Sequence, residues 1–331
     1  MARKKIVLAA VISCVVFIFG SLSSAIADTL LFPVIAVNQP NVTTIISIMN
    51  EADTSSAAYL NYIYRVKDSI VENLPNITGE CSAVKFTRPT YYHDLVSFDA
   101  SGIMNNGNAL FGDTDSYGGG FGIGLTGPRR AYLLVSHANS SGTRVDVGST
   151  SKLVGEAIIM DIMYGAAWGY KAVNDTERED YTFTITGLAG AAIQLEAPNY
   201  RGFSFFPLHE WNTRFFVTPI GTSMDTANLE GTVRLSTTLH VINRSGAEYT
   251  FTPPEFSPKC TAAIDLKDMM DSTTKSAVDT TGGYSRFCVQ SGGGSPGNPV
   301  IAYKLDYAVN NPTYGGTNNN GYLITNTWAM P

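Results

Sequence analysis

Residues 28–50 read DTLLFPVIAVNQPNVTTIISIMN and carry almost no charge. Residues 30–37 contain two alternating apolar sets, Leu30, Phe32, Val34 and Ala36 in one and Leu31, Ile35 and Val37 in the other. Successive side chains of a β-strand point to opposite faces. We therefore expect a strand that is buried on both faces, between two layers of the fold. Pro33 has no N–H and predicts that this strand lies at a sheet edge or at a strand start.

An apolar edge strand left in water pairs readily with other chains, so this segment needs a partner. One alternative is pairing within its own sandwich, with VTTIISIM as the hairpin neighbour across the turn NQPN. The other is strand addition to a neighbouring copy of the protein, which would make the chain a self-assembling subunit. The short turn favours the local pairing, because closing a short loop costs little entropy.

Residues 1–27 have the organisation of a bacterial secretory signal peptide. Three cations in MARKK precede the apolar run IVLAAVISCVVFIFG, and Ala25 and Ala27 follow in the A-x-A arrangement. We expect cleavage between Ala27 and Asp28. An uncleaved membrane anchor is the alternative, but the apolar run is short for a membrane span of roughly 20 residues. The remaining sequence holds no apolar run long enough to form a transmembrane segment. This predicts a bacterial protein that is secreted or held at the cell surface, with the periplasm as the alternative location.

The composition favours β-sheet and argues against nucleic acid as a partner. Charged residues make up 15% of the chain, against about 25% in typical soluble proteins. Removal of the signal peptide takes away three cations and no acids, which lowers the formal net charge from −6 to −9. An acidic chain without a basic patch is not suited to nucleic acid. Frequent Thr and Tyr suit a pleated sheet.

Alternation continues along the chain and predicts an all-β, antiparallel sandwich. Period-two patterns occur in YLNYIYRVK, GTVRLSTTLHVI and AYKLDYAV, and Gly, Asn and Pro clusters separate these segments. We expect two sandwich domains, at residues 28–198 and 199–331. One short helix is expected near residues 262–272, where apolar residues recur at helical spacing.

The start of the mature chain resembles a known class of module. An FP pair, the Thr-rich segment TTIISIMN and the alternating segment YLNYIYRVK are similar to the opening of Ig-like β-sandwich modules in bacterial secreted and surface proteins. The resemblance covers residues 30–67. It implies a sandwich fold on an exported protein and supplies no functional residues, because these modules share no fixed site.

Cys81, Cys260 and Cys288 remain after removal of the signal peptide. Outside the cytosol, a pair of cysteines is expected to oxidise. Cys260 and Cys288 are the closer pair in sequence, which predicts a disulfide between them. Cys81 would then be a buried thiol or a link to another chain.

Two sequence motifs resemble cofactor-binding or catalytic motifs, but the residues around them do not fit those functions. GIGLTG at residues 122–127 is followed by Pro128 instead of a helix start, and GGSPG at residues 293–297 places a proline where an oxyanion donor is needed. Asp113 and Asp115 in GDTDSYGGG are the candidate metal ligands, for Ca²⁺, with a solvated acidic turn as the alternative. We expect no other cofactor and no catalytic residues.

Two classes of function remain open. The first is a non-catalytic structural or adhesive protein of the cell surface, with itself or other envelope proteins as partners. The second is an extracellular carbohydrate-binding module or hydrolase, for which surface glycans are the ligands. The aromatic residues considered for such a sugar platform are Tyr91, Tyr92, Trp168, Tyr170 and Trp211. Packing in the core is the alternative, and it is the more frequent use of Trp and Tyr.

Overall fold

Strand β1 (Thr29–Val37) runs through the molecule with both faces buried. It pairs antiparallel with β6 (Arg129–Ala138) on one side, and with β9 (Val173–Asp175) only at its start on the other side. Leu30 and Leu31 are fully buried in two different hydrophobic clusters, on opposite faces of the strand. The expectation that both faces are covered is confirmed.

Pro33 lies at a β-bulge in β1. The register with β6 shifts between Phe32 and Ile35, as expected where a residue cannot donate an N–H to the ladder. The shift moves Ile35 onto the face of Phe32, where uninterrupted alternation places Val34. The two-sided burial was therefore predicted correctly, whereas the phase of the second half of the strand was wrong.

Strand β2 (Val42–Asn50) lies in the sheet that faces β1, so the expected β1–β2 hairpin is wrong. A turn closed by the 2.8 Å bond from Val42 N to Asn38 O carries the chain across. The two strands are joined by the hydroxyl of Thr44, which lies 2.9 Å from both the N and the O of Ala36. β1 instead finds its ladder partners in β6 and β9, so the chain forms an arch between two layers.

The computed structural model describes most of the strands and their connections. The described residues are 29–38, 41–52, 58–67, 81–102, 123, 129–145, 153–161, 166–175, 181, 183, 200–226, 229, 233–235, 241–252, 254, 258–289, 300–309 and 322–330. Every strand pairing among them is antiparallel. The prediction of an antiparallel, all-β, sandwich-like fold is confirmed.

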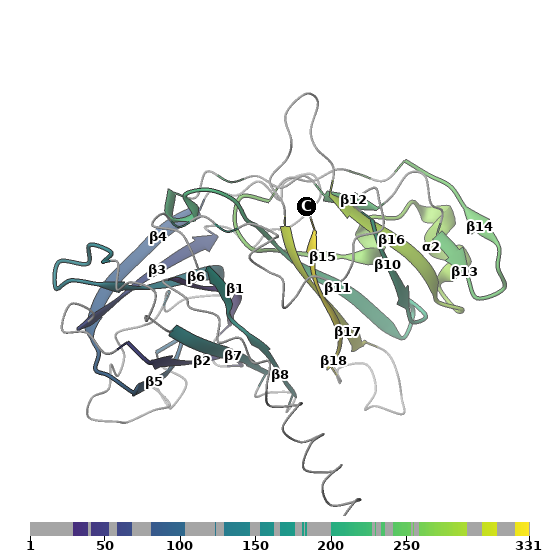
Figure 1. The fold of residues 1–331 in the computed structure, drawn as a ribbon. Coiled ribbons are helices and arrows are strands. Elements are labelled where there is room, and N and C mark those ends of the chain that lie inside the picture. Colours follow the sequence, from purple (N-terminus) through teal and green to yellow (C-terminus); the bar gives the residue numbers. More distant parts are fainter. Residues whose placement is uncertain are drawn as a thin grey trace, which may run out of the picture.

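Two sheets form the first half of the molecule (Figure 1). Sheet 1 has the order β4-β3-β6-β1-β9, with β3 at Tyr59–Lys67 and β4 at Cys81–Pro89. Sheet 2 has the order β5-β2-β7-β8, with β5 at Asp94–Asp99, β7 at Leu153–Asp161 and β8 at Ala166–Lys171. Residues 153–172 admit a helix or two strands by sequence, and their glycines and β-branched residues favour strands; β7 and β8 confirm the pair of strands.

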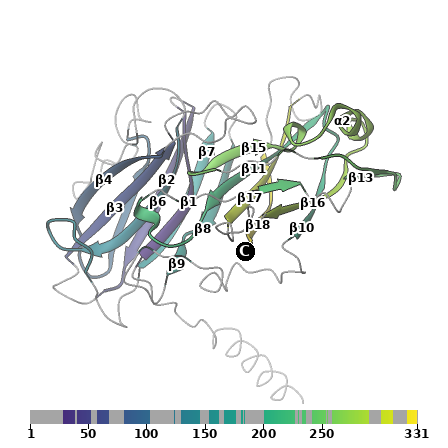
Figure 2. The ribbon, with the colours of Figure 1, turned by 90° about the horizontal axis from the view of Figure 1, so that it is seen from above.

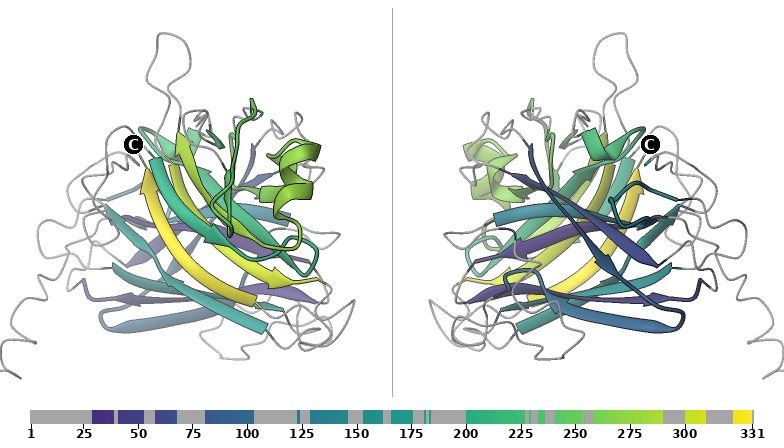
Figure 3. Two further views of the ribbon diagram at one scale, coloured as in Figure 1. Left: turned by 90° about the vertical axis from the view of Figure 1, so that its right-hand side faces the viewer. Right: turned by 90° about the vertical axis from the view of Figure 1, so that its left-hand side faces the viewer.

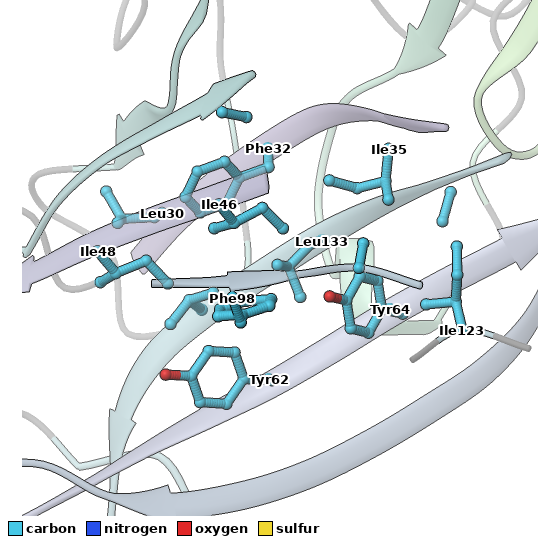
Figure 4. Packing of buried hydrophobic residues seen from close by; sticks show 14 of the residues in the cluster. Leu30, Phe32, Ile35, Ile46, Ile48, Tyr62, Tyr64, Phe98, Ile123 and Leu133 are labelled. Carbon is cyan, nitrogen blue, oxygen red and sulfur yellow. The ribbon is translucent and has the colours of Figure 1, made fainter. Parts of the chain in front are cut away.

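The core of the first half lies between sheets 1 and 2 (Figure 4). Leu30 and Phe32 of β1 and Tyr62 and Tyr64 of β3 contribute fully buried side chains to it. The rings of Tyr62 and Phe98 meet edge to face, with centroids 5.8 Å apart. This cluster fixes which face of sheet 2 is the inner one.

Two further sheets form the second half. Sheet 3 has the order β10-β16-β13-β14, with β12 also paired to β16. Sheet 4 has the order β15-β11-β17-β18. The bounds are β10 Tyr200–Phe205, β11 Trp211–Pro219, β12 Val233–Leu235, β13 Val241–Asn243, β14 Glu248–Tyr249, β15 Ala262–Asp265, β16 Gly283–Val289, β17 Val300–Ala308 and β18 Tyr322–Met330.

The helix of the second half begins later than predicted. Residues 262–265 are strand β15, paired with β11, and a 3-10 turn, η5 (Leu266–Asp268), follows. The α-helix α2 spans Ser272–Val278, and Asp271 caps it by accepting a 2.7 Å bond from the backbone N of Thr274. The apolar spacing in residues 262–272 did mark buried side chains, but the backbone bonds of the first four residues go to β11.

A third hydrophobic cluster joins the two halves, which lie side by side in Figure 2. Trp168 of β8 packs against Phe216 of β11, with ring centroids 5.8 Å apart. The carbonyl of Pro33 accepts hydrogen bonds from the hydroxyls of Thr218 at 2.6 Å and Thr261 at 2.7 Å. Strand β18 also contacts β8 (Figure 3). The second half therefore covers the part of β1 that β9 leaves unpaired.

A disulfide crosses the same junction, between Cys81 at the start of β4 and Cys260 just before β15, with Cα atoms 5.8 Å apart. The predicted Cys260–Cys288 bridge is therefore wrong. Cys288 lies in β16, opposite Tyr200 in sheet 3, whereas Cys260 leads into sheet 4. Closeness in sequence did not bring the two cysteines together, because the chain passes through α2 into a different sheet between them.

The expected domain boundary near residue 198 lies outside the described residues. All described strands of sheets 1 and 2 precede it, and all those of sheets 3 and 4 follow it.

Candidate interaction surface

The outer face of sheet 2 is the feature that stands out for function. Along β5 and β7, alternate side chains enter the core, while Leu95, Val154 and Ile158 point away from it and are 63%, 50% and 39% exposed. In Figure 1 this face is turned away from the other labelled strands. Exposed apolar patches on a sheet of this kind are typical of interaction sites.

The strand registers arrange the outward side chains in rows across the sheet. Leu95, Met49 and Val154 lie directly opposite one another and form the first apolar row. Ile45 and Ile158 form a second apolar row together with Gly169. Asp99 lies opposite Ile45 at the β5 end of this row, where it is buried and bonded to Ser101 and Gly102. The row between them is polar and consists of Ser97, Ser47, Glu156 and Lys171. The outer face thus has an apolar, polar, apolar order along the strands.

The polar row contains one acid and one base in adjacent strands. Glu156 and Lys171 are directly opposite each other across β7 and β8, and both are exposed. Opposite charges at such positions attract each other, which reduces the cost of removing them from water together. At the other end of the row, the hydroxyls of Ser47 and Ser97 are 3.0 Å apart.

An aromatic turn, residues 90–93, adjoins the first apolar row, and Tyr91 in it is 69% exposed. The neighbouring rings of Tyr92 and His93 stack with centroids 3.7 Å apart. His93 has a φ of 62°, a left-handed backbone conformation that is uncommon for a residue other than glycine. The backbone of the turn is therefore in an unfavourable conformation, and hydrogen bonds from neighbouring residues are needed to stabilise it.

Asn50 at the end of β2 supplies that support. Its side-chain amide donates to the carbonyl of Tyr91 at 3.1 Å and to the hydroxyl of Thr90 at 3.2 Å. Its carbonyl oxygen lies 3.0 Å from Nε2 of His137, which is fully buried. Burial, with a further contribution from the positive charge of Arg144, lowers the pKa of His137 to about 4. The ring is therefore neutral at pH 7 and can donate from Nε2 to Asn50.

A cavity of about 370 Å³ lies against sheet 1. Its lining includes Lys85, Arg144, Tyr181 and Asp225. The hydroxyl of Tyr181 bonds to Ser136 at 2.9 Å, and Arg144 lies over the tyrosine ring at 5.3 Å. Tyr181 and Arg144 thus interact with other residues of the protein around the cavity.

The structure separates the aromatic residues of the predicted sugar platform. Tyr91 and Tyr92 are exposed, whereas Trp168 is buried in the third cluster and Trp211 is half-buried. The hydroxyl of Tyr170 bonds to the backbone of Val34, so this side chain joins β8 to β1. Only the two tyrosines of the aromatic turn are free to meet a ligand as the platform prediction requires.

The remaining predicted site residues lie mostly outside the described residues. This applies to Asp113 and Asp115, to the signal cleavage site at Ala27 and Asp28, and to the GGSPG motif. Within the described part of the chain, no group of three or more His, Cys, Asp and Glu side chains could hold a metal ion. The calcium prediction is therefore untested.

Sequence reasoning missed the outer face of sheet 2. The signal was present in VTTIISIM and LVGEAIIM, where Ile45 and Ile158 occupy the phase opposite to the core residues. An apolar residue in both phases also predicts a strand buried on both faces, as in β1. Only the absence of a covering layer among the described residues distinguishes the two cases.

No helix among the described residues is long and apolar enough to span a membrane. Comparison of the chain with known protein families, with curated proteins and with solved structures finds no match.

Proposed function

We propose that this protein is an exported, non-catalytic structural or adhesive protein of the bacterial cell surface, and that it binds through the outer face of sheet 2. The observation that carries this proposal is the pair of exposed apolar rows on that face. Burying such side chains in a partner releases roughly 25 cal/mol for each Å² of apolar surface. Binding of a partner to this face is therefore favoured by the burial of apolar surface.

Two other features support the location. The first 27 residues have the organisation of a secretory signal. The Cys81–Cys260 disulfide is compatible with an oxidising compartment outside the cytosol.

The test compares two substitutions of equally exposed apolar residues. Ile158 on the outer face of sheet 2 is 39% exposed, and Tyr284 on β16 in the second half is 38% exposed. The mature protein and the variants Ile158→Lys and Tyr284→Lys are mixed with cell-envelope fragments and sedimented. We expect Ile158→Lys to lower the fraction that sediments by about tenfold, and Tyr284→Lys to behave as the unchanged protein.

Circular dichroism and thermal unfolding verify that both variants are folded. Equal sedimentation of the unchanged protein and Ile158→Lys would contradict the proposal. The proposal would also be contradicted if the mature protein without substitutions neither sediments with the envelope fragments nor associates with itself.

A second candidate function is carbohydrate binding, which the exposed pair Tyr91 and Tyr92 favours. Tyrosine rings can stack on the apolar face of a sugar. A glycan array with the mature protein and the variant Tyr92→Ala separates the two functions. Glycan binding that is lost in Tyr92→Ala and retained in Ile158→Lys would favour the carbohydrate function.

A further inference from the structure

We propose that the outer face of sheet 2 binds the same face of a second copy of this chain, around a two-fold axis that runs parallel to the strands between β2 and β7. This inference rests on the proposed function and names the partner of the same surface.

The order of the rows makes the face complementary to itself. Rotation about a two-fold axis parallel to the strands leaves the position of each row along the strands unchanged. It reverses the order in which the four strands cross the row. β2 of one copy then lies over β7 of the other, because the axis passes between the two central strands of the order β5-β2-β7-β8. Met49 meets Val154, and Ile45 meets Ile158, so apolar side chains meet apolar side chains in both rows.

The charges select this axis over its alternative. Reversal of the polar row places Glu156 of one copy over Ser47 of the other, and Lys171 over Ser97. Each charge thus meets a hydroxyl group and keeps its opposite charge beside it in its own sheet. An axis perpendicular to the strands would instead place Glu156 over Glu156, and like charges across an interface are costly.

The size of the face is adequate for such a dimer. β2 and β7 have nine residues each, which span about 30 Å, and four strands at a spacing of about 4.8 Å span roughly 19 Å. Because β5 and β8 are shorter, the footprint is about 500 Å², so two copies would bury about 1,000 Å² in total, which is the lower threshold for a specific interface. The turn with Tyr91 and Tyr92 adds aromatic side chains at the rim, and aromatic residues are enriched in interfaces.

Ser97 provides the decisive test, because in its own sheet it lies three strands away from Lys171. The association of the mature protein is measured by sedimentation velocity over a concentration series. We expect a dimer whose Kd rises by about 100-fold in Ile158→Lys and by about 10-fold in Ser97→Lys, which faces Lys171 of the second copy. Ser97→Glu should bind at least as tightly as the unchanged protein.

The double variant Ser97→Lys/Lys171→Glu should bind more tightly than Ser97→Lys alone, although its new carboxylate lies opposite Glu156 in its own sheet and keeps the restoration incomplete. This rescue also shows that Ser97→Lys is folded. If Ser97→Glu and Ser97→Lys weaken the dimer equally, the proposed axis is wrong, because Ser97 then faces Ser97.

A failure of this inference can be distinguished from a failure of the proposed function. A protein that stays monomeric at all concentrations, yet binds envelope fragments in a way that Ile158→Lys abolishes, would overturn the dimer and retain the proposed function. A protein that neither dimerises nor binds envelope fragments would overturn both.

Discussion

The Nε2 atom of His137 in β6 and the Oδ1 atom of Asn50 in β2 are 3.0 Å apart, and both side chains are buried. This contact joins the ends of two strands that belong to different sheets. The amide of Asn50 in turn holds the backbone of the aromatic turn, through its 3.1 Å bond to Tyr91. The neutral imidazole of His137 therefore helps to position Asn50, which in turn stabilises the exposed aromatic turn.

The first prediction concerns acid stability. His137 has a pKa of about 4 in the folded protein, below the ordinary value of about 6.5 in an unfolded chain. As the pH falls from about 6.5 to 4, the unfolded chain takes up a proton that the folded chain does not. The free energy of unfolding should drop by about 1.4 kcal/mol per pH unit in this window, or roughly 3 kcal/mol in total. Urea unfolding at several pH values measures it.

His137→Gln is the matched variant, because its amide can still donate to Asn50. Its stability between pH 6.5 and 4 should fall less steeply than that of the unchanged protein. Identical slopes in the two proteins would show that His137 does not titrate as described.

The second prediction concerns the disulfide. Peptide mapping without reduction should recover a fragment that links Cys81 to Cys260. The bridge encloses a segment with a sequence separation of 179 residues, so the chain-entropy model gives a contribution of about 5 kcal/mol. Cys81→Ser/Cys260→Ser should lower the midpoint of thermal unfolding. A linked fragment that contains Cys288 and Cys260 would contradict the pairing.

The third prediction concerns Gly155, where β7 closely approaches β1. A Cβ atom at this position would lie 2.6 Å from the ring of Phe32 and 2.9 Å from Leu30. Gly155→Ala should therefore destabilise the protein by about 1–3 kcal/mol. Phe32→Leu/Gly155→Ala removes the ring that causes the clash, so its destabilisation should be smaller than the sum of the two single effects. Additive effects in denaturant unfolding would argue against this contact.

The fourth prediction concerns the buried ion pair of Lys304 and Asp306 on β17. Burial lowers the pKa of Lys304, and the charge of Asp306 opposes this shift. Asp306→Asn would leave the ammonium group without its buried partner and should cost about 3–5 kcal/mol in the free energy of unfolding. Lys304→Met/Asp306→Asn removes both charges and keeps an acceptor for Thr213, so it should be more stable than Asp306→Asn alone. The reverse order of stability would contradict the pairing.

The fifth prediction concerns β1. A chain that lacks residues 28–38 should lose cooperative thermal unfolding, because β6 would lose one of its two ladder partners and two hydrophobic clusters would lose their shared strand. Near-ultraviolet circular dichroism and calorimetry measure this loss. Retention of a sharp unfolding transition would show that β1 is not an internal strand.

The alternation of residues 30–37 was sufficient to predict that β1 is buried on both faces, because period-two spacing directly determines which side chains share a face. The strands at residues 59–67 and 300–308 could be predicted for the same reason. These are local properties, and each depends on the conformation of one strand.

Contacts between distant segments were decided only by the tertiary structure. The bulge at Pro33 reversed the phase of the residues after it, and Cys260 met a cysteine from the first half instead of its nearer neighbour in the sequence. The exposure of Ile158 could not be predicted from the sequence either, because the apolar pattern of its strand resembles that of a strand covered on both faces. The sequence by itself determined several of the strands, such as those at residues 29–37 and 59–67, whereas residues 262–265 became a strand only by pairing with β11. Sheet membership, the cysteine pair and the uncovered face likewise depend on how the sheets stack, because burial between sheets involves residues that are far apart in the sequence.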